Sequence, residues 1–308
     1  MNNKIKILID TDTNNELDDQ HALAYAFLNS DVFDLVGVTV NNTIKGAGIQ
    51  GHYDEALRII KLFNLENKMP LKKGAVGIYD EIKTNIGKDN FDGHEAVDFI
   101  IAQARKMKND TLTLLETGKL TNIALALLKA PDIINKVKVV WLGSNYPEPG
   151  EYNLENDTTA VNPVIESGVN FGMVLVRYGE DSGTAAVTVT LDEIRANVAG
   201  KGPLAKEPIT GRHGGEFRRF GDYSLNLFEN AGMHGTSQTR ALFDMAAVAI
   251  VKNPSWAEKV EIPAPKLVGT GWVEQPQNPH KIFIYENFNR DAIVNDFFRL
   301  LAASTDSE

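Results

Sequence analysis

The sequence contains no cysteine, no long hydrophobic run and comparatively few basic residues. Without cysteine there are no disulfide bonds, thiolate metal sites or cysteine nucleophiles, which fits a reducing compartment. No segment approaches the ~20 apolar residues that a membrane-spanning helix needs. The N-terminus MNNKIKILID also lacks the apolar stretch of a secretory leader. We therefore expect a cytoplasmic protein that is not associated with membranes.

Acidic residues outnumber basic ones, 41 to 31, which gives a formal net charge of −10. A general nucleic-acid binder contacts phosphates through clustered Lys and Arg, so this charge argues against a nucleic-acid partner. A neutral small ligand is compatible with it, and a bound cation would reduce it. The proportions of hydrophobic (43%) and charged (23%) residues are those of an ordinary globular protein.

Apolar segments of strand length alternate with segments of helical periodicity along the chain. Strands are expected at 4–9, 34–40, 73–77, 111–116, 137–142, 172–178 and 281–286, and helices at 18–29, 52–63, 94–108, 120–130, 216–231, 239–253 and 290–304. This order predicts a Rossmann-like α/β fold with a mostly parallel sheet, helices on both faces and helical additions in the C-terminal third. No repeat or Pro/Gly-rich linker interrupts the pattern, so we expect one domain over residues 1–308.

Five acidic residues gather where the first predicted strand meets the first predicted helix, in ILIDTDTNNELDDQHALAYAF (7–27). They are Asp10, Asp12, Glu16, Asp18 and Asp19. One or two acidic residues here could cap the helix, with the rest facing solvent. Capping does not account for five, because carboxylates this close repel one another unless a cation lies between them. Oxygen ligands favour a hard divalent ion, Ca²⁺ or Mg²⁺.

Polar residues also follow the other predicted strands: Asn41, Asn42 and Thr43 after one, Thr117 and Gly118 after the next, and Gly143, Ser144 and Asn145 after a third. Ligands of open parallel sheets bind beyond the carboxyl ends of the strands. Each group alone is typical of an ordinary turn, but together they predict a polar site at one edge of the sheet.

Four motifs, in this order, resemble those of the inosine–uridine preferring nucleoside hydrolases. The DTD and DD of the acidic bend resemble the opening DxDPGxDD motif. The other three are ETGKLTNIALAL (116–127), GEYNLENDTTA (150–160) and ALFDMAAVA (241–249), which resemble TGPLTNIA, EFN…D and LHDPxAVA motifs. The resemblance covers most of the chain. It implies a parallel-sheet α/β fold, hydrolysis of the N-glycosidic bond of a riboside, a Ca²⁺ ion at the strand ends, and a homodimer or homotetramer.

The resemblance also implies roles for individual residues. Asp12, Asp19, the backbone carbonyl of Thr117, and Asp244 would bind Ca²⁺, and Asp12 would be the base that activates water. The remaining residues expected to contact substrate are Asp18, Asn42, His94, Asn145, Glu151, Asn153 and Tyr223. Cleavage passes through an oxocarbenium-like sugar, and a carboxylate-rich pocket is complementary to its positive charge.

Three features depart from the family pattern, the first being that the EYN segment continues as LENDTTAVNP and not as the usual apolar stretch with Asp-Pro. The TNNEL segment between Asp12 and Asp18 is two residues longer than usual, which places Glu16 near the expected metal as an additional ligand or a cap. Phe243 stands where many purine-active members have a histidine that protonates the leaving base. His213 and His234 flank the expected leaving-group side and are candidates to replace it, whereas His21 is expected to pack or to face solvent.

Two alternatives remain open. A phosphatase of the haloacid dehalogenase type also begins with a strand and a DxD pair, but Asp18-Asp19 follows too soon to be its second acidic pair. A Ca²⁺-dependent sugar-binding relative without catalytic activity would account for Phe243 and for the TNNEL segment. Release of free ribose from a riboside would distinguish a nucleoside hydrolase from both alternatives.

Overall fold

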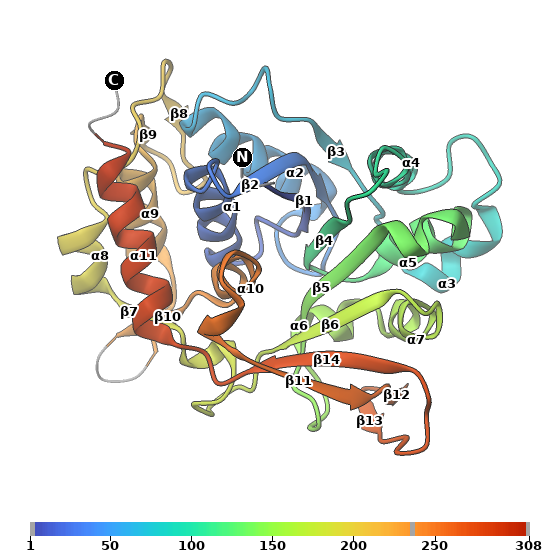
Figure 1. Ribbon diagram of the computed structural model, residues 1–308. Coiled ribbons are helices and arrows are strands. Elements are labelled where there is room, and N and C mark those ends of the chain that lie inside the picture. Colours follow the sequence, from blue (N-terminus) through green and yellow to red (C-terminus); the bar gives the residue numbers. More distant parts are fainter. Residues whose placement is uncertain (1–3, 235–237, 306–308) are drawn as a thin grey trace.

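A central eight-stranded sheet organises the computed structural model, which describes residues 4–234 and 238–305 (Figure 1). The strand order is β11-β14-β6-β5-β4-β1-β2-β3, and every neighbouring pair is parallel except β11–β14. The strands are β1 (Ile5–Thr11), β2 (Phe33–Val40), β3 (Leu71–Lys73), β4 (Leu112–Thr117), β5 (Val137–Ser144), β6 (Asn170–Leu175), β11 (Glu258–Pro263) and β14 (Lys281–Glu286). The predicted mostly parallel α/β sheet is confirmed.

Helices cover both faces of this sheet (Figure 1). They are α1 (Asp18–Leu28), α2 (Gly48–Leu62), α3 (Tyr79–Ile82), α4 (His94–Arg105), α5 (Thr121–Lys129), α6 (Tyr152–Asn156), α7 (Thr158–Glu166), α8 (Leu191–Asn197), α9 (Phe220–Asn230), α10 (Phe243–Lys252) and α11 (Arg290–Ala303). One apolar core forms between the sheet and α1, α2, α9, α10 and α11, and the other between the sheet and α4, α5 and α7. The helices α9 to α11 are the expected additions in the C-terminal third.

The alternation of side chains along β1 shows why both faces need a cover. Ile7 and Ile9 lie in the core with α1, whereas Leu8 lies in the core with α4 and α5. Successive strand residues point to opposite faces, and a parallel sheet buried on both sides is therefore almost continuously apolar. No helix among the described residues has both the length and the apolar character to cross a membrane.

Four elements differ most from the sequence prediction. The strand expected at 73–77 is β3, which ends at Lys73. Helix α2 begins at Gly48, before the predicted start at 52. The helices expected at 216–231 and 239–253 each begin with a short strand, β9 (Glu216–Phe217) and β10 (Thr239–Ala241). These strands pair with β8 (Ile209–Thr210) and β7 (Thr188–Thr190), contacts that a helical pattern does not reveal. A third hairpin joins β12 (Lys266–Val268) and β13 (Gly271–Val273).

The carboxyl ends of the central strands lie at one level. Thr11, the last residue of β1, is opposite both Val40 of β2 and Thr117 of β4. The segments that follow these three strands therefore begin side by side, at the edge of the sheet where an open α/β fold binds its ligand.

Candidate active site

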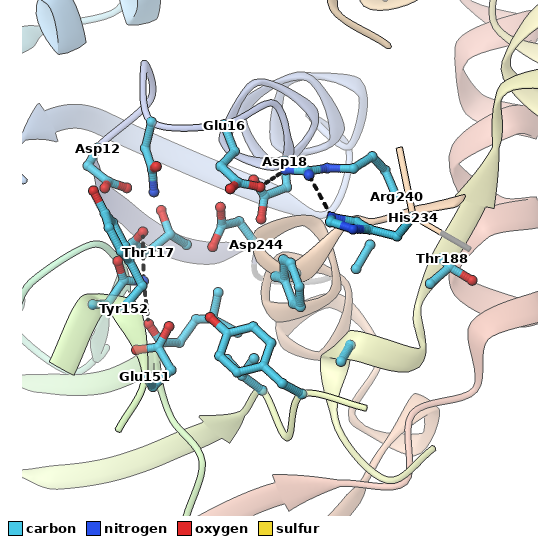
Figure 2. Close-up of a pocket in the computed structure, with 18 of the residues that line it drawn as sticks. Asp12, Glu16, Asp18, Thr117, Glu151, Tyr152, Thr188, His234, Arg240 and Asp244 are labelled. Carbon is cyan, nitrogen blue, oxygen red and sulfur yellow. Dashed lines mark hydrogen bonds and ion pairs between the residues drawn. The ribbon is translucent and has the colours of Figure 1, made fainter. Parts of the chain in front are cut away.

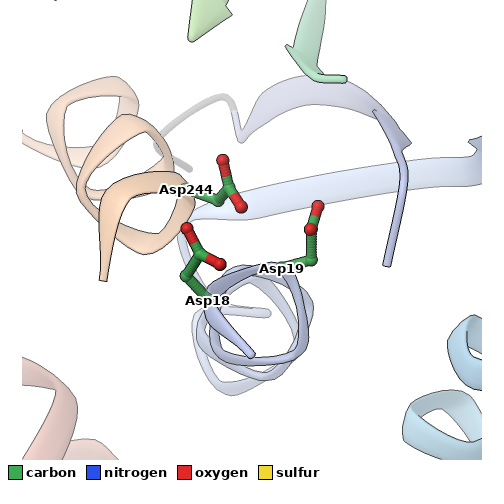
Figure 3. Close-up of side chains that lie close together, drawn as sticks. All are labelled: Asp18, Asp19 and Asp244. Carbon is green, nitrogen blue, oxygen red and sulfur yellow. The ribbon is translucent and has the colours of Figure 1, made fainter. Parts of the chain in front are cut away.

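Three carboxylates meet at this edge (Figure 3). Asp18 and Asp19 are the first two residues of α1, and Asp244 is the second residue of α10. One oxygen of each lies within 4.8 Å of the others, and all three side chains are buried. Helix N-termini favour negative charge because their free N–H groups and dipoles point outward. Two helix starts thus support an acidic cluster that the sheet edge alone would not hold.

The strand ends hold the neighbouring carboxylates. Asp12, which directly follows β1, is 1% exposed, and its Oδ2 accepts a hydrogen bond of 2.5 Å from the hydroxyl of Thr43. The hydroxyls of Thr11 and Thr117 both donate to Oδ1 of Asp19, the latter over 3.0 Å. Oδ1 of Asp12 is buried and has no hydrogen-bond partner among the described residues. A buried acceptor without a partner is costly, which indicates that a ligand completes this group.

The negative charges of these carboxylates repel one another. Burial, opposed by the Thr43 hydrogen bond and reinforced by the charge of Asp18, raises the pKa of Asp12 to about 7. Burial and then the charge of Asp19 raise the pKa of Asp18 to about 7 as well. The pKa values of Asp19 and Asp244 lie well above their ordinary values, through burial and then the charges of Asp12 and Asp18 respectively. A divalent cation with a preference for oxygen would reduce this repulsion, so the residues present fit a site for a hard divalent cation.

A cavity of about 500 Å³ opens in front of the cluster (Figure 2). Glu151 and Asn153 line it at the start of α6, after β5. Glu151 accepts a hydrogen bond from the backbone N–H of Leu154 over 3.1 Å, and burial raises its pKa to about 8. The side-chain amide of Asn153 donates to the carbonyl oxygens of Leu142 and Thr117, over 2.9 and 3.3 Å. Its own Oδ1 is buried and unpaired among the described residues, so an acceptor remains for a ligand.

The other wall of the cavity is partly aromatic. The rings of Tyr178 and Phe243 meet edge to face with their centroids 5.9 Å apart, and both line the cavity. The cavity wall also includes Arg240, which forms an ion pair with Glu16 and contacts Nε2 of His234. The cavity therefore has an acidic end and an aromatic, partly basic end. That division suits a ligand with a polyhydroxylated part and a flat heterocyclic part.

The two-residue extension of the first loop is anchored on several sides. Asn14 donates its backbone N–H to Nδ1 of His52 over 3.2 Å and its side-chain amide to the carbonyl of Gly46 over 2.7 Å. The carboxylate of Glu16 lies between Arg240 and Lys45, the latter 3.8 Å away. The TNNEL segment is therefore a fixed part of the cavity rim.

The structure brings together seven of the residues predicted for the site. Asp12, Asp18, Thr117, Glu151, Asn153 and Asp244 line the cavity, and Asp19 joins Asp18 and Asp244 in the cluster. Asn42, His94, Asn145 and Tyr223 are not among the described residues that line it.

Tyr223 and His94 are held elsewhere by their own contacts. Tyr223 is fully buried in the core, where its hydroxyl donates to Glu55 over 2.6 Å. His94 is the first residue of α4, and its Nδ1 lies 3.0 Å from the carbonyl of Phe91. Neither side chain therefore reaches the cavity in this structure.

The other three histidines considered in the sequence analysis lie in different environments. His21 is fully buried, as expected for a packing residue, with its Nε2 2.8 Å from the hydroxyl of Ser224. His213 accepts a hydrogen bond from Arg212 outside the cavity wall, whereas His234 lies on that wall.

Sequence reasoning missed much of the remaining cavity wall, including Lys45, Tyr178 and Arg240. Tyr178 is the last residue of the predicted strand at 172–178 and lies just beyond β6, so the rule that ligands bind at strand ends could have identified it. Lys45 follows the polar residues after β2 in the same way. Arg240 was hidden, because the segment around it was predicted to be helical and instead begins as β10.

Solved structures share this architecture. A plant nucleoside hydrolase superposes with a TM-score of 0.73 at 16% identity, with 98% of this chain and 100% of that chain covered. A purine-preferring ribonucleoside hydrolase from Gardnerella vaginalis gives 0.74 at 20% identity, with the same coverage. The fold is thus that of the nucleoside hydrolases.

The sequence comparisons define the family. An uncharacterised protein of Schizosaccharomyces pombe is 29% identical over 222 residues, which span 64% of this chain and 69% of that protein. The inosine–uridine preferring nucleoside hydrolase of Leishmania major is 33% identical over 155 residues, 48% of this chain and 45% of that enzyme. The family model of the inosine–uridine preferring nucleoside hydrolases matches residues 7–295, and the chain belongs to this family. It is accordingly a hydrolase that acts on N-glycosyl bonds.

Proposed function

We propose that this enzyme uses Ca²⁺ to hydrolyse the N-glycosidic bond of a ribonucleoside or a related riboside, with release of ribose and the base. The single observation that supports this most strongly is the convergence of four buried carboxylates at one end of a 500 Å³ cavity. A transition state with positive charge on the sugar suits such a site.

In this proposal Asp12, Asp19, the carbonyl of Thr117 and Asp244 hold the cation. A bound Ca²⁺ supplies positive charge that orients a water molecule, lowers the pKa of that water and positions sugar hydroxyls. Asp12 is the general base: its Oδ1, unpaired among the described residues, accepts a proton from the attacking water. The hydroxyl of Thr43 keeps the other oxygen of Asp12 in place.

Three further residues orient the sugar. Asp18, Glu151 and Asn153 face the cavity and offer acceptors to ribose hydroxyls. For Asn42 and Asn145, each of which has a buried Oδ1 without a partner among the described residues, we propose contacts in the loaded enzyme only. We further propose a cytoplasmic homodimer or homotetramer that acts in nucleoside catabolism.

A reducing-sugar assay over a panel of ribosides tests this function. Asp12→Asn should lower ribose release by about 10²- to 10⁴-fold, the usual contribution of a general base. The matched control is Asp192→Asn, because the Asp192 side chain is 94% exposed on α8, outside the cavity wall. An unchanged rate in the Asp12 variant would exclude the proposed base.

The same panel distinguishes the sugar-binding alternative. A relative without catalytic activity would bind ribose in calorimetry and release no base from any riboside. The phosphatase alternative predicts turnover of a phosphomonoester, and the family match over residues 7–295 does not favour it.

A further inference from the structure

We propose that the guanidinium of Arg240 binds the departing base in this enzyme, and that Glu16 positions it for that task. This inference rests on the proposed function and deepens it, because it names the residue on which the choice of leaving group depends. A base that carries a carbonyl oxygen, such as uracil or hypoxanthine, can accept from this guanidinium through that oxygen, whereas adenine has no such oxygen.

The position of Arg240 places it beside the leaving group. It lies on β10, four residues before Asp244 and three before Phe243, and all three side chains line the cavity. A sugar held at the acidic cluster directs its base toward the rest of the cavity wall. Figure 2 shows Arg240 beside Asp18 and Glu16 at that side of the cluster. The rings of Tyr178 and Phe243 provide the apolar surface that a flat heterocycle needs.

The hydrogen bonds of Arg240 leave two donors for a ligand. A guanidinium has five N–H groups. Nη1 uses both of its protons, toward the carbonyl of Gly232 at 2.9 Å and Nε2 of His234 at 3.0 Å. Nη2 donates to Glu16. Among the described residues, Nε–H and the second Nη2–H have no partner, although the side chain is only 10% exposed. Because Arg240 lines the cavity, these two donors are available to a ligand with acceptor atoms.

Glu16 and His234 fix the orientation of this group. Glu16 belongs to the longer first loop and forms an ion pair with Nη2. Nε2 of His234 faces an N–H of Arg240 and must therefore present its lone pair there. That nitrogen cannot also donate a proton to the base, so the guanidinium is the better candidate for the leaving-group contact.

The chemistry requires such a contact. When the bond between C1′ and the base nitrogen breaks, its electron pair goes to the base, while water oxygen bonds to C1′ and passes a proton to Asp12. The base leaves with negative charge that spreads to its carbonyl oxygens. Phe243 has no proton to donate. Arginine remains protonated, so it stabilises the anion by charge and hydrogen bonds, and the base takes its proton from solvent after departure.

Two substrates with different leaving groups test this inference. Arg240→Met should lower kcat for uridine and inosine by about 10²-fold, the usual loss for one donor to a developing anion. It should change kcat for 4-nitrophenyl β-ribofuranoside by a few-fold at most, because nitrophenolate is stable in water as an anion. The matched control is Arg195→Met, because Arg195 is 51% exposed and pairs with Asp192 and Glu229 on the surface.

In Arg240→Met the carboxylate of Glu16 loses its arginine partner, and a second variant tests whether that change causes the loss of activity. In Glu16→Gln/Arg240→Met neither charge remains, and we expect the same selective loss for uridine and inosine as in the single variant. Recovery of nucleoside activity in the double variant, an equal loss for all three substrates, or no loss at all would overturn the role of Arg240. Failure of the unaltered enzyme to release ribose from any of the three would instead contradict the proposed function.

Discussion

Asp244→Asn should stabilise the metal-free protein and abolish its stabilisation by calcium. Asp244 shares the cluster with Asp18 and Asp19, whose ligand oxygens lie within 4.8 Å. Two unit charges at that distance repel by about 3 kcal/mol at an effective dielectric constant of 20. Partial protonation relieves part of this repulsion, so we expect the variant to gain about 2 kcal/mol at pH 8 without metal. For a chain of this size that corresponds to a rise in Tm of roughly 3 °C.

The gain should depend on pH in a defined direction. Burial raises the pKa values of Asp12 and Asp18 to about 7, and burial with the charge of Asp18 raises the pKa of Asp244 well above its ordinary range. A carboxyl group whose folded pKa is raised destabilises the fold above that pKa and has no such effect below its unfolded pKa. The advantage of the variant should therefore be largest at pH 8 and vanish as the pH falls to about 4.

In the presence of calcium the unaltered protein should be more stable than Asp244→Asn, the reverse of their order without metal. A free concentration 100-fold above Kd stabilises the unaltered protein by about 2.7 kcal/mol, whereas the variant lacks one ligand and gains little. Thermal unfolding in chelator and in calcium measures both effects, with Asp192→Asn as the control. If calcium leaves the Tm of the unaltered protein unchanged, or if the variant is less stable in chelator, the three carboxylates do not form a cation site.

Two further predictions concern the anchor of the first loop. In a denaturant titration, Gly46→Ala should lower the free energy of unfolding by about 1–3 kcal/mol or more. Gly46 has a φ of +93°, and a Cβ at this position would lie 2.2 Å from Cε1 of His52. The matched control Gly87→Ala should be nearly neutral, because a Cβ at Gly87 would meet nothing within 4 Å. Burial lowers the pKa of His52 to about 4, so the unfolded chain takes up a proton first and stability is lost as the pH falls from about 6.5 to 4. We compare the free energies of unfolding of the unaltered protein and of His52→Gln. The difference between them should fall by about 3 kcal/mol as the pH falls over that range. A difference that does not change with pH would contradict this role of His52.

The sequence was sufficient to predict the sheet, because buried parallel strands such as β1 and β4 are locally apolar and end in polar residues. It also placed Asp12, Asp18 and Asp19 at the correct edge, since strand ends in such a sheet lie at one level. The position of Asp244 followed from a family motif and not from any local pattern. The paired register of β1 and β4, which brings Thr11 and Thr117 to one carboxylate, was visible only in the structure.

Other features depended on contacts between distant segments. Tyr223 was correctly placed on a helix, but Glu55 on α2 determines that its hydroxyl points into the core. The segment from Thr239 has a helical pattern, yet pairing with β7 makes it a strand and turns Arg240 toward Glu16. The hydrophobic pattern along the chain does not predict which distant segment a residue contacts.

The most direct test is ribose release by metal-free enzyme during titration with calcium. We expect no measurable hydrolysis of inosine or uridine after removal of metal, and full recovery when one equivalent of Ca²⁺ per chain has been added. Hydrolysis at an undiminished rate in excess chelator would contradict a catalytic cation at Asp12, Asp19 and Asp244.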